Sequence, residues 1–130
     1  MAHILLVDDD ELLRDTLLQL LELDGHTVGD AASAEDGLTM FDRGGAAIDL
    51  VITDVLMPGL DGARFIVELR RRRPRLPIVA ISGGRRVLSS KFSLETALLA
   101  GATSQLAKPF SRHELQSALR HALSAETPAP

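Results

Sequence analysis

Five short apolar runs, each about as long as a β-strand, alternate along this chain with longer segments that have helical spacing. The runs cover residues 3–7, 27–31, 49–53, 77–82 and 103–107. A parallel strand can be reached only through a long return connection, so this alternation favours parallel pairing with right-handed crossovers. The sequence therefore predicts an α/β fold, in which helices cover both faces of one doubly wound, five-stranded parallel sheet.

The connecting segments carry apolar residues three or four positions apart, as one face of a helix requires. The first holds leucines at positions 12, 13, 17, 20, 21 and 23 and stops ahead of Gly25, a residue typical of helix ends. A second helix is expected to begin at Ser33, and others to cover residues 62–72, 90–100 and 111–123. Ser111 and Glu114 have the spacing of a capping box, which marks the start of the last helix.

Composition bounds the classes of protein that the chain can belong to. With 130 residues, 45% of them apolar, it has the size of one domain, and its formal charge of −4 gives no sign of a nucleic-acid partner. The absence of cysteine excludes disulfides and thiolate zinc sites. No apolar run is long enough to cross a membrane, and the start lacks a signal-peptide pattern. We expect a cytoplasmic domain over residues 1–124, followed by a flexible tail or linker at 125–130.

Polar residues stand where four of the predicted strands end. In a doubly wound sheet, ligands bind beyond the carboxyl ends of the strands. This rule selects Asp8 and Asp9 after the first strand, Asp54 after the third, Ser82 at the end of the fourth and Lys108 after the fifth. These five residues are the candidate site.

Three aspartates at one rim of a sheet would repel one another unless a cation neutralised them. Oxygen ligands without cysteine or histidine favour Mg²⁺, with Mn²⁺ as the alternative. A carboxylate, a magnesium ion, a lysine and a small hydroxyl suit phosphoryl transfer, in which catalysis is mostly positioning and charge neutralisation. The carboxylate itself can be the nucleophile, which gives an aspartyl phosphate.

Four sequence pieces also resemble a known family. They are Val7-Asp8-Asp9-Asp10, the ten residues from Thr53 to Gly62, Ala80-Ile81-Ser82-Gly83 and Ala107-Lys108-Pro109-Phe110. Together they cover almost the whole chain in the order found in the receiver domains of response regulators, the phosphoacceptors of two-component signal transduction. The resemblance implies a flavodoxin-like fold with strand order 2-1-3-4-5.

The resemblance also implies roles for individual residues. Asp54 would be phosphorylated, Asp9 would bind the metal directly and Asp8 would help through water, with the main-chain carbonyl of Leu56 as a further ligand. Ser82 and Lys108 would contact phosphoryl oxygens after transfer. Asp10 matches no functional position, so we expect it at the start of the first helix. Pro109 would follow Lys108 through a cis peptide bond.

The function implied is that of a phosphoacceptor switch rather than an enzyme, since it would catalyse only its own phosphorylation and dephosphorylation. The phosphoryl group would come from a partner histidine kinase or phosphotransfer protein in a phosphorelay. The resulting change of conformation would regulate a downstream protein or an attached output domain, with phosphorylation-dependent dimerisation as a further outcome. Neither nucleic acid nor membrane is an expected direct partner.

Two features depart from the family pattern. Gln105 stands where many receivers carry Tyr or Phe, a ring that swings inward on phosphorylation, so we expect the signal to leave this domain by a different route. The segment between Ser82 and Gly101 is several residues longer than is common. It predicts an extended loop between the fourth strand and the fourth helix.

Other interpretations remain open at this stage. A phosphatase similar to the haloacid dehalogenase superfamily would use Asp8 and Asp10, but it would leave Asp54 without a role. A pseudo-receiver that binds partners without phosphorylation is made conceivable by Gln105. The arginine-rich stretch at 70–75 suggests nucleic acid, yet it falls at a helix C-terminus, where cations complement the helix dipole. Aromatic residues for base stacking are almost absent from the chain.

Overall fold

The computed structural model describes residues 2–55, 62–83 and 101–124, without the side chain of Ser82. In chain order, the elements are β1 (His3–Val7), α1 (Glu11–Leu23), β2 (Thr27–Ala31), α2 (Ala34–Gly44), a 3₁₀ turn (Gly45–Ala47), β3 (Leu50–Asp54), α3 (Gly62–Arg72), β4 (Ile78–Gly83), β5 (Ser104–Lys108) and α5 (Arg112–Ser124). None of the described helices is both long enough and apolar enough to cross a membrane.

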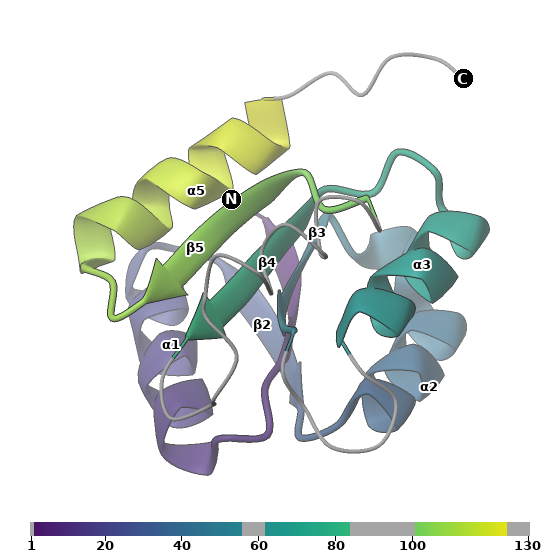
Figure 1. The fold of residues 1–130 in the computed structure, drawn as a ribbon, viewed down its shortest axis with the longest axis horizontal. Coiled ribbons are helices and arrows are strands. Elements are labelled where there is room, and N and C mark those ends of the chain that lie inside the picture. The colour runs from purple at the N-terminus through teal and green to yellow at the C-terminus, as the bar shows by residue number, and fades with distance from the viewer. Residues whose placement is uncertain (1, 56–61, 84–100, 125–130) are drawn as a thin grey trace.

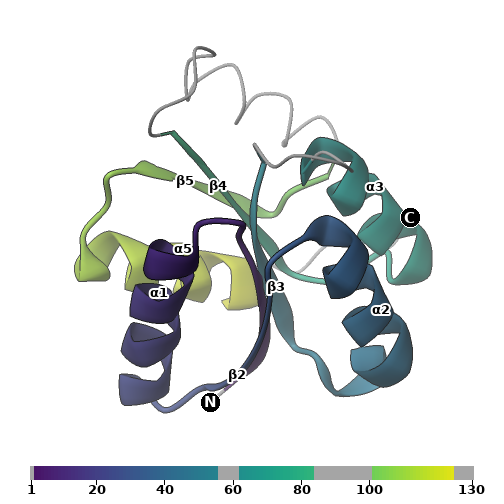
Figure 2. The same cartoon turned by 90° about the horizontal axis from the view of Figure 1, so that it is seen from below.

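The sheet is parallel, with the strand order β2-β1-β3-β4-β5. Helices α1 and α5 lie on one face and α2 and α3 on the other (Figures 1 and 2). Successive residues of β1 point to opposite faces, so Ile4 and Leu6 belong to the α1/α5 core, whereas Leu5 and Val7 belong to the α2/α3 core. The predicted fold class, doubly wound topology and strand order are confirmed.

The predicted strands agree with the observed ones to within one residue. The first two have the predicted bounds, while the other three begin and end one residue later than expected. Pairing continues past the last apolar residue, because Asp54 is in register with Ile81 and Lys108 with Gly83. The helix expected at residues 90–100 and the long loop expected before it fall outside the described residues.

Helix starts follow the predicted capping chemistry. Asp10 is the N-cap of α1 and accepts a hydrogen bond from the Leu13 N–H at 3.2 Å. At the start of α5, Ser111 Oγ accepts from the Glu114 N–H while Glu114 Oε1 accepts from the Ser111 N–H, each at 3.0 Å. This is a complete capping box. The cap at Asp10 starts α1 immediately after Asp8 and Asp9.

Two arginines at the end of α3 bind the segments that enter the sheet. Arg70 donates to the carbonyl oxygens of Leu76 and Gly101 and, at 3.0 Å, to Thr103 Oγ1, which joins the starts of β4 and β5. Arg73 donates to the carbonyl oxygens of Gly45 and Ile48 ahead of β3. We call this end of the sheet, where the strands begin, the amino edge, and the opposite end the carboxyl edge. Two arginines of the stretch at 70–75 are therefore used for hydrogen bonds within the domain.

Candidate metal centre at the carboxyl edge

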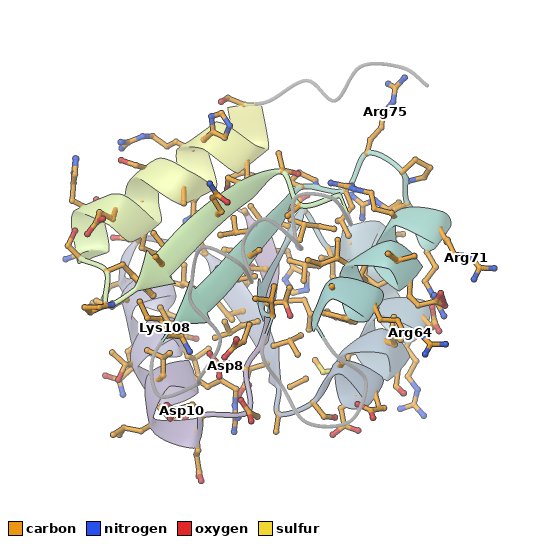
Figure 3. All side chains as sticks on the ribbon, in the orientation of Figure 1. Asp8, Asp10, Arg64, Arg71, Arg75 and Lys108 are labelled. Atoms are coloured by element: carbon orange, nitrogen blue, oxygen red, sulfur yellow. The ribbon has the colours of Figure 1, made fainter. Side chains whose placement is uncertain are left out.

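The sheet register brings the predicted site residues to one end of the molecule. Val7 is in register with Thr53, so Asp8 and Asp54 follow at the ends of neighbouring strands. Lys108 ends β5, two strands from β3. Figure 3 shows Asp8 and Lys108 in the same region at the carboxyl edge, away from Arg71 near the end of α3. The carboxyl-end rule therefore selected residues that do come together.

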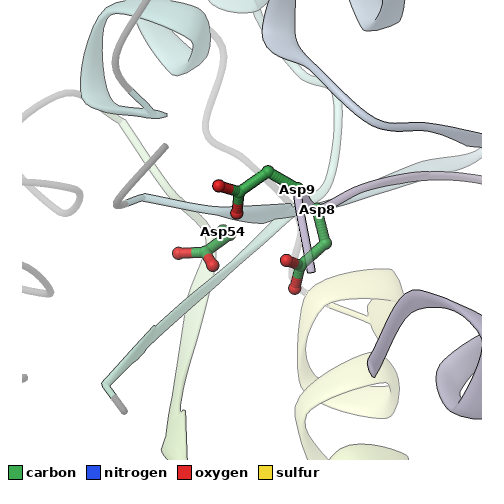
Figure 4. Close-up of side chains that lie close together, drawn as sticks. All are labelled: Asp8, Asp9 and Asp54. Atoms are coloured by element: carbon green, nitrogen blue, oxygen red, sulfur yellow. The ribbon is translucent and has the colours of Figure 1, made fainter. Parts of the chain in front are cut away.

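Asp8, Asp9 and Asp54 form one acidic cluster. Each offers a carboxylate oxygen, and these oxygens lie within 4.8 Å of one another (Figure 4). Asp8 and Asp54 are buried, whereas Asp9 is exposed. Close carboxylates of which two are shielded from water repel each other strongly, and a hard divalent cation relieves that repulsion. The cluster has the donor set that such a cation prefers.

Lys108 supplies a positive charge beside this cluster. Its Nζ lies 3.0 Å from Asp54 Oδ2, to which it donates a hydrogen bond, and 3.6 Å from Asp8 Oδ2. Burial lowers the pKa of Lys108, but the charges of Asp54 and Asp8 outweigh this effect and hold its pKa above the usual value. The lysine is therefore protonated at neutral pH and offsets part of the acidic charge.

Asp8 is the most constrained member of the cluster. Its Oδ1 accepts a hydrogen bond from the Asp10 N–H at 2.9 Å, while its buried Oδ2 has no hydrogen-bond partner among the described residues. Burial, and secondarily the charge of Asp54, raises the pKa of Asp8 to about 6, although the Asp10 N–H opposes the shift. A buried carboxylate oxygen without a donor, beside two further carboxylates, fits a site for a divalent cation.

Two side chains that the sequence did not mark as functional support the site. Arg14 donates to the main-chain carbonyl of Asp8 at 2.7 Å and pairs with Asp30 at 3.0 Å. The buried hydroxyl of Thr53 donates to the carbonyl of Asp54 at 2.9 Å. The one sequence signal for Arg14 is its spacing of four residues, about one helical turn, from Asp10. This spacing places Arg14 on the same side of α1 as Asp10, which lies three residues after the end of β1.

The other predicted positions have mixed outcomes. In β4, Ser82 is in register with Ala107, one residue before Lys108, but its side chain lies outside the described part of the chain, as does Leu56. The Lys108–Pro109 peptide bond is cis, as the family resemblance implied. Gln105, the departure from the pattern, is exposed on β5. Asp10 caps α1 and is not part of the acidic cluster.

Comparisons with known proteins agree with this geometry. The family described as "Response regulator receiver domain" matches residues 4–120. The response regulator protein FleR of Pseudomonas aeruginosa is 39% identical over 123 residues, which are 94% of this chain. The crystal structure of the receiver domain of NtrX from Brucella abortus superposes with a TM-score of 0.85 at 30% identity, over 95% of this chain and 99% of that one. Chemotaxis protein CheY4 of Vibrio cholerae gives a TM-score of 0.82 at 28% identity, over 95% and 99%.

The curated relatives are longer than this chain. The match spans 25% of FleR and 46% of the probable transcriptional regulator ycf27 of Cyanidium caldarium. The shared part is thus one domain of proteins that contain more.

Proposed function

Because this chain belongs to the response regulator receiver domain family, we propose that it accepts a phosphoryl group on Asp54 with Mg²⁺ bound at the acidic cluster. As a receiver domain, it is a signalling phosphoacceptor rather than an enzyme that turns over a separate substrate. The observation that carries the assignment to Asp54 is its contact with Lys108, 3.0 Å away, beside the buried Oδ2 of Asp8, which has no hydrogen-bond partner in the described part of the chain. A nucleophile, a cation site and a fixed ammonium group are then adjacent.

In the proposed reaction, a carboxylate oxygen of Asp54 bonds to phosphorus while the phosphorus–nitrogen bond of a phosphohistidine donor breaks. The donor imidazole leaves with the electron pair of that bond, and Asp54 becomes a mixed anhydride. Lys108 donates a hydrogen bond to a phosphoryl oxygen, and Ser82 binds another. Mg²⁺ held by Asp8, Asp9, Asp54 and the Leu56 carbonyl would neutralise charge on the transferred oxygens.

The partner that this chemistry requires is a histidine kinase or a histidine phosphotransfer protein, and we place the encounter in the cytoplasm. Relatives such as FleR extend well beyond the region that matches this chain, so we propose that phosphorylation here regulates a downstream protein or an attached output domain. Gln105 stands where many receivers carry an aromatic ring that moves inward on phosphorylation. We therefore propose that this domain transmits the signal through a different conformational change. We propose domain boundaries at residues 1–124, with a flexible tail or the start of a linker at 125–130, which lies outside the described residues.

Acetyl phosphate offers a direct test that needs no kinase. The wild type incubated with acetyl phosphate and Mg²⁺ should gain one phosphoryl group, seen by intact-protein mass spectrometry and removed by hydroxylamine. Asp54→Asn should gain none. Asp49→Asn is the matched control, because Asp49 lies just before β3 at the amino edge and accepts a hydrogen bond from the His3 N–H.

The outcomes separate the remaining interpretations. Labelling of Asp54→Asn to the wild-type level would refute the assignment. No labelling and no Mg²⁺ binding by the wild type would instead favour a pseudo-receiver. The phosphatase interpretation has lost its basis, because it needs Asp10 beside Asp8 as a reacting group, and the Asp10 carboxylate is the N-cap of α1.

A further inference from the structure

Arg14 connects three parts of the carboxyl edge. It belongs to the first turns of α1, its Nη1 donates to the Asp8 carbonyl at the end of β1, and its Nε pairs with Asp30 in β2. Its side chain is only 14% exposed. The Asp8 carbonyl is a main-chain acceptor in a partly buried position, whereas the Asp30 carboxylate is exposed, so the two bonds together orient a guanidinium group that is itself mostly shielded from water.

The contacts of Asp8 show what that orientation controls. The Asp8 N–H donates to the Ala31 carbonyl at 3.2 Å, the Asp8 carbonyl accepts from Arg14, and Oδ1 accepts from the Asp10 N–H. Three of its polar atoms are therefore held by neighbouring main chain or by Arg14. The remaining atom, Oδ2, lies next to Lys108 at the cluster.

The carbonyl that Arg14 holds belongs to the peptide group between Asp8 and Asp9. Because a peptide group is planar, fixing its carbonyl also fixes the direction in which the chain enters Asp9. Asp30 offsets part of the guanidinium charge, and the contact of Arg14 with Asp8 is to a main-chain carbonyl, so Arg14 acts on the cluster mainly through geometry.

We propose that Arg14, oriented by Asp30, is a positioning residue that sets the Asp8–Asp9 peptide and thereby aligns both carboxylates for a divalent cation. This inference rests on the proposed function, since it assumes that the acidic cluster binds a metal. Supporting groups around metal ligands typically change metal affinity by ten- to a hundredfold when they are replaced.

The test measures binding of the metal alone. Mn²⁺ binding to the full chain is followed by the loss of the free-ion electron paramagnetic resonance signal, at pH 8, for the wild type, Arg14→Gln, Arg14→Lys and Asp30→Asn. We expect about tenfold weaker binding for both Arg14 variants, because lysine keeps the charge but not the planar fork. Asp30→Asn should show a smaller loss, since asparagine can still accept a hydrogen bond.

Arg72→Lys is the matched control for stability. Arg72 also joins an aspartate, Asp42 at 2.7 Å, and a main-chain carbonyl, that of Glu68, but it does so at the far end of α3. Its replacement should lower the thermal midpoint without changing Mn²⁺ affinity. Wild-type affinity in Arg14→Lys would overturn the inference, as would an equal loss of affinity in Arg72→Lys.

Failure of the inference can be told apart from failure of the proposed function. If the wild type binds Mn²⁺ and accepts phosphate while the Arg14 variants bind equally well, only the positioning role is wrong. If the wild type binds no Mn²⁺, both are wrong. Should Arg14→Gln unfold, Arg14→Lys decides the question, and unchanged Mn²⁺ affinity in Asp30→Asn would contradict the role given to Asp30 in orienting Arg14.

Discussion

The two edges of the sheet use the same residue types in opposite ways. At the amino edge, Arg70 and Arg73 bind main-chain carbonyls, and the carboxylate of Asp49 accepts the His3 N–H. At the carboxyl edge, Asp8 keeps a buried oxygen without a hydrogen-bond partner among the described residues, and Lys108 faces two carboxylates at once. At the amino edge, the charged side chains form hydrogen bonds that stabilise the fold. At the carboxyl edge, the carboxylates of the acidic cluster outnumber the single lysine beside them.

This contrast separates stability from function. At the amino edge, the polar groups are hydrogen-bonded, so removing one of them should lower the free energy of unfolding. The buried carboxylate of Asp8 at the carboxyl edge should destabilise the metal-free fold, because burial opposes its charge and raises its pKa. Removing a satisfied polar group at the amino edge and removing the buried charge of Asp8 are therefore expected to change the free energy of unfolding in opposite directions.

The largest expected effect is at the amino edge. Arg70→Ala removes the donors of the Leu76 and Gly101 carbonyls and one of two donors to Thr103 Oγ1, which keeps its hydrogen bond from the Ile78 N–H. Partly buried acceptors that lose their donor destabilise a fold, so we expect a loss of about 3 kcal/mol in the free energy of unfolding. Urea denaturation followed by circular dichroism measures it, and Mg²⁺ affinity of the folded fraction should stay at the wild-type value.

Arg71→Ala is the matched control for this substitution. Arg71 is the next residue of α3, its side chain is 74% exposed, and it points away from the protein (Figure 3). In the described part of the chain it pairs with Glu68, on the same helix. We expect no measurable change in the urea midpoint, and equal losses for the two variants would contradict the role given to Arg70.

A substitution at the carboxyl edge should have the opposite sign. Asp8→Asn removes a buried negative charge, and we expect it to stabilise the metal-free protein by about 2 kcal/mol at pH 7. The same change should abolish the rise in thermal midpoint that Mg²⁺ gives the wild type. Thermal denaturation with EDTA and with excess Mg²⁺ measures both effects. If Asp8→Asn destabilised the metal-free protein, the two edges would not differ in the way that we infer.

The pH dependence follows from the same residue. Burial raises the pKa of Asp8 to about 6 from 3.8, so between these values the folded state binds a proton more tightly than the unfolded state. The free energy of unfolding of the metal-free protein should therefore fall as pH rises from about 4 to 6, and the contribution should then stay constant. Asp8→Asn should lack this part of the slope, which isolates the contribution of Asp8 from those of other acids.

The sequence predicted most of the fold because its signals are local. Hydrophobic runs and helical spacing fixed the strands to within a residue, and the carboxyl-end rule selected Asp8, Asp54 and Lys108 before any contact was known. The capping roles of Asp10 and Ser111 were also readable, since each cap depends on residues three positions apart.

The contacts that were missed are long-range. Arg70 and Arg71 are adjacent in one run of arginines, yet Arg70 reaches Gly101, 31 residues away, whereas Arg71 pairs with Glu68 of its own helix. Which arginine turns inward depends on where α3 packs beside the start of β5, and no local pattern records that. The contact of Arg14 with the Asp8 carbonyl is hidden for the same reason, because it depends on how α1 packs against the end of β1.

A smaller effect is expected from the lysine of the carboxyl edge. Lys108→Gln removes a positive charge that repels an incoming cation, so Mg²⁺ should bind about fivefold more tightly, which corresponds to about 1 kcal/mol. Phosphorylation by acetyl phosphate should nevertheless slow, because the hydrogen bond donor beside Asp54 is gone. Calorimetry at pH 8, above the pKa of about 6 that Asp8 has in the wild type, measures the affinity. Weaker Mg²⁺ binding would show that Lys108 holds the carboxylates in place rather than competing with the cation.

The smallest expected effect tests whether every residue at the carboxyl edge contributes to Mg²⁺ binding, or only the charged residues of the acidic cluster and Lys108. Ser111 caps α5 only three residues after Lys108, yet its hydrogen bonds with Glu114 are satisfied. Ser111→Ala should therefore lower the free energy of unfolding by about 0.5 to 1 kcal/mol, with Mg²⁺ affinity unchanged. Ser117→Ala, within the same helix, should cause no loss, because alanine is the better helix former. If Ser111→Ala weakened Mg²⁺ binding, the start of α5 would belong to the metal site, and the functional part of this edge would extend beyond its charged residues.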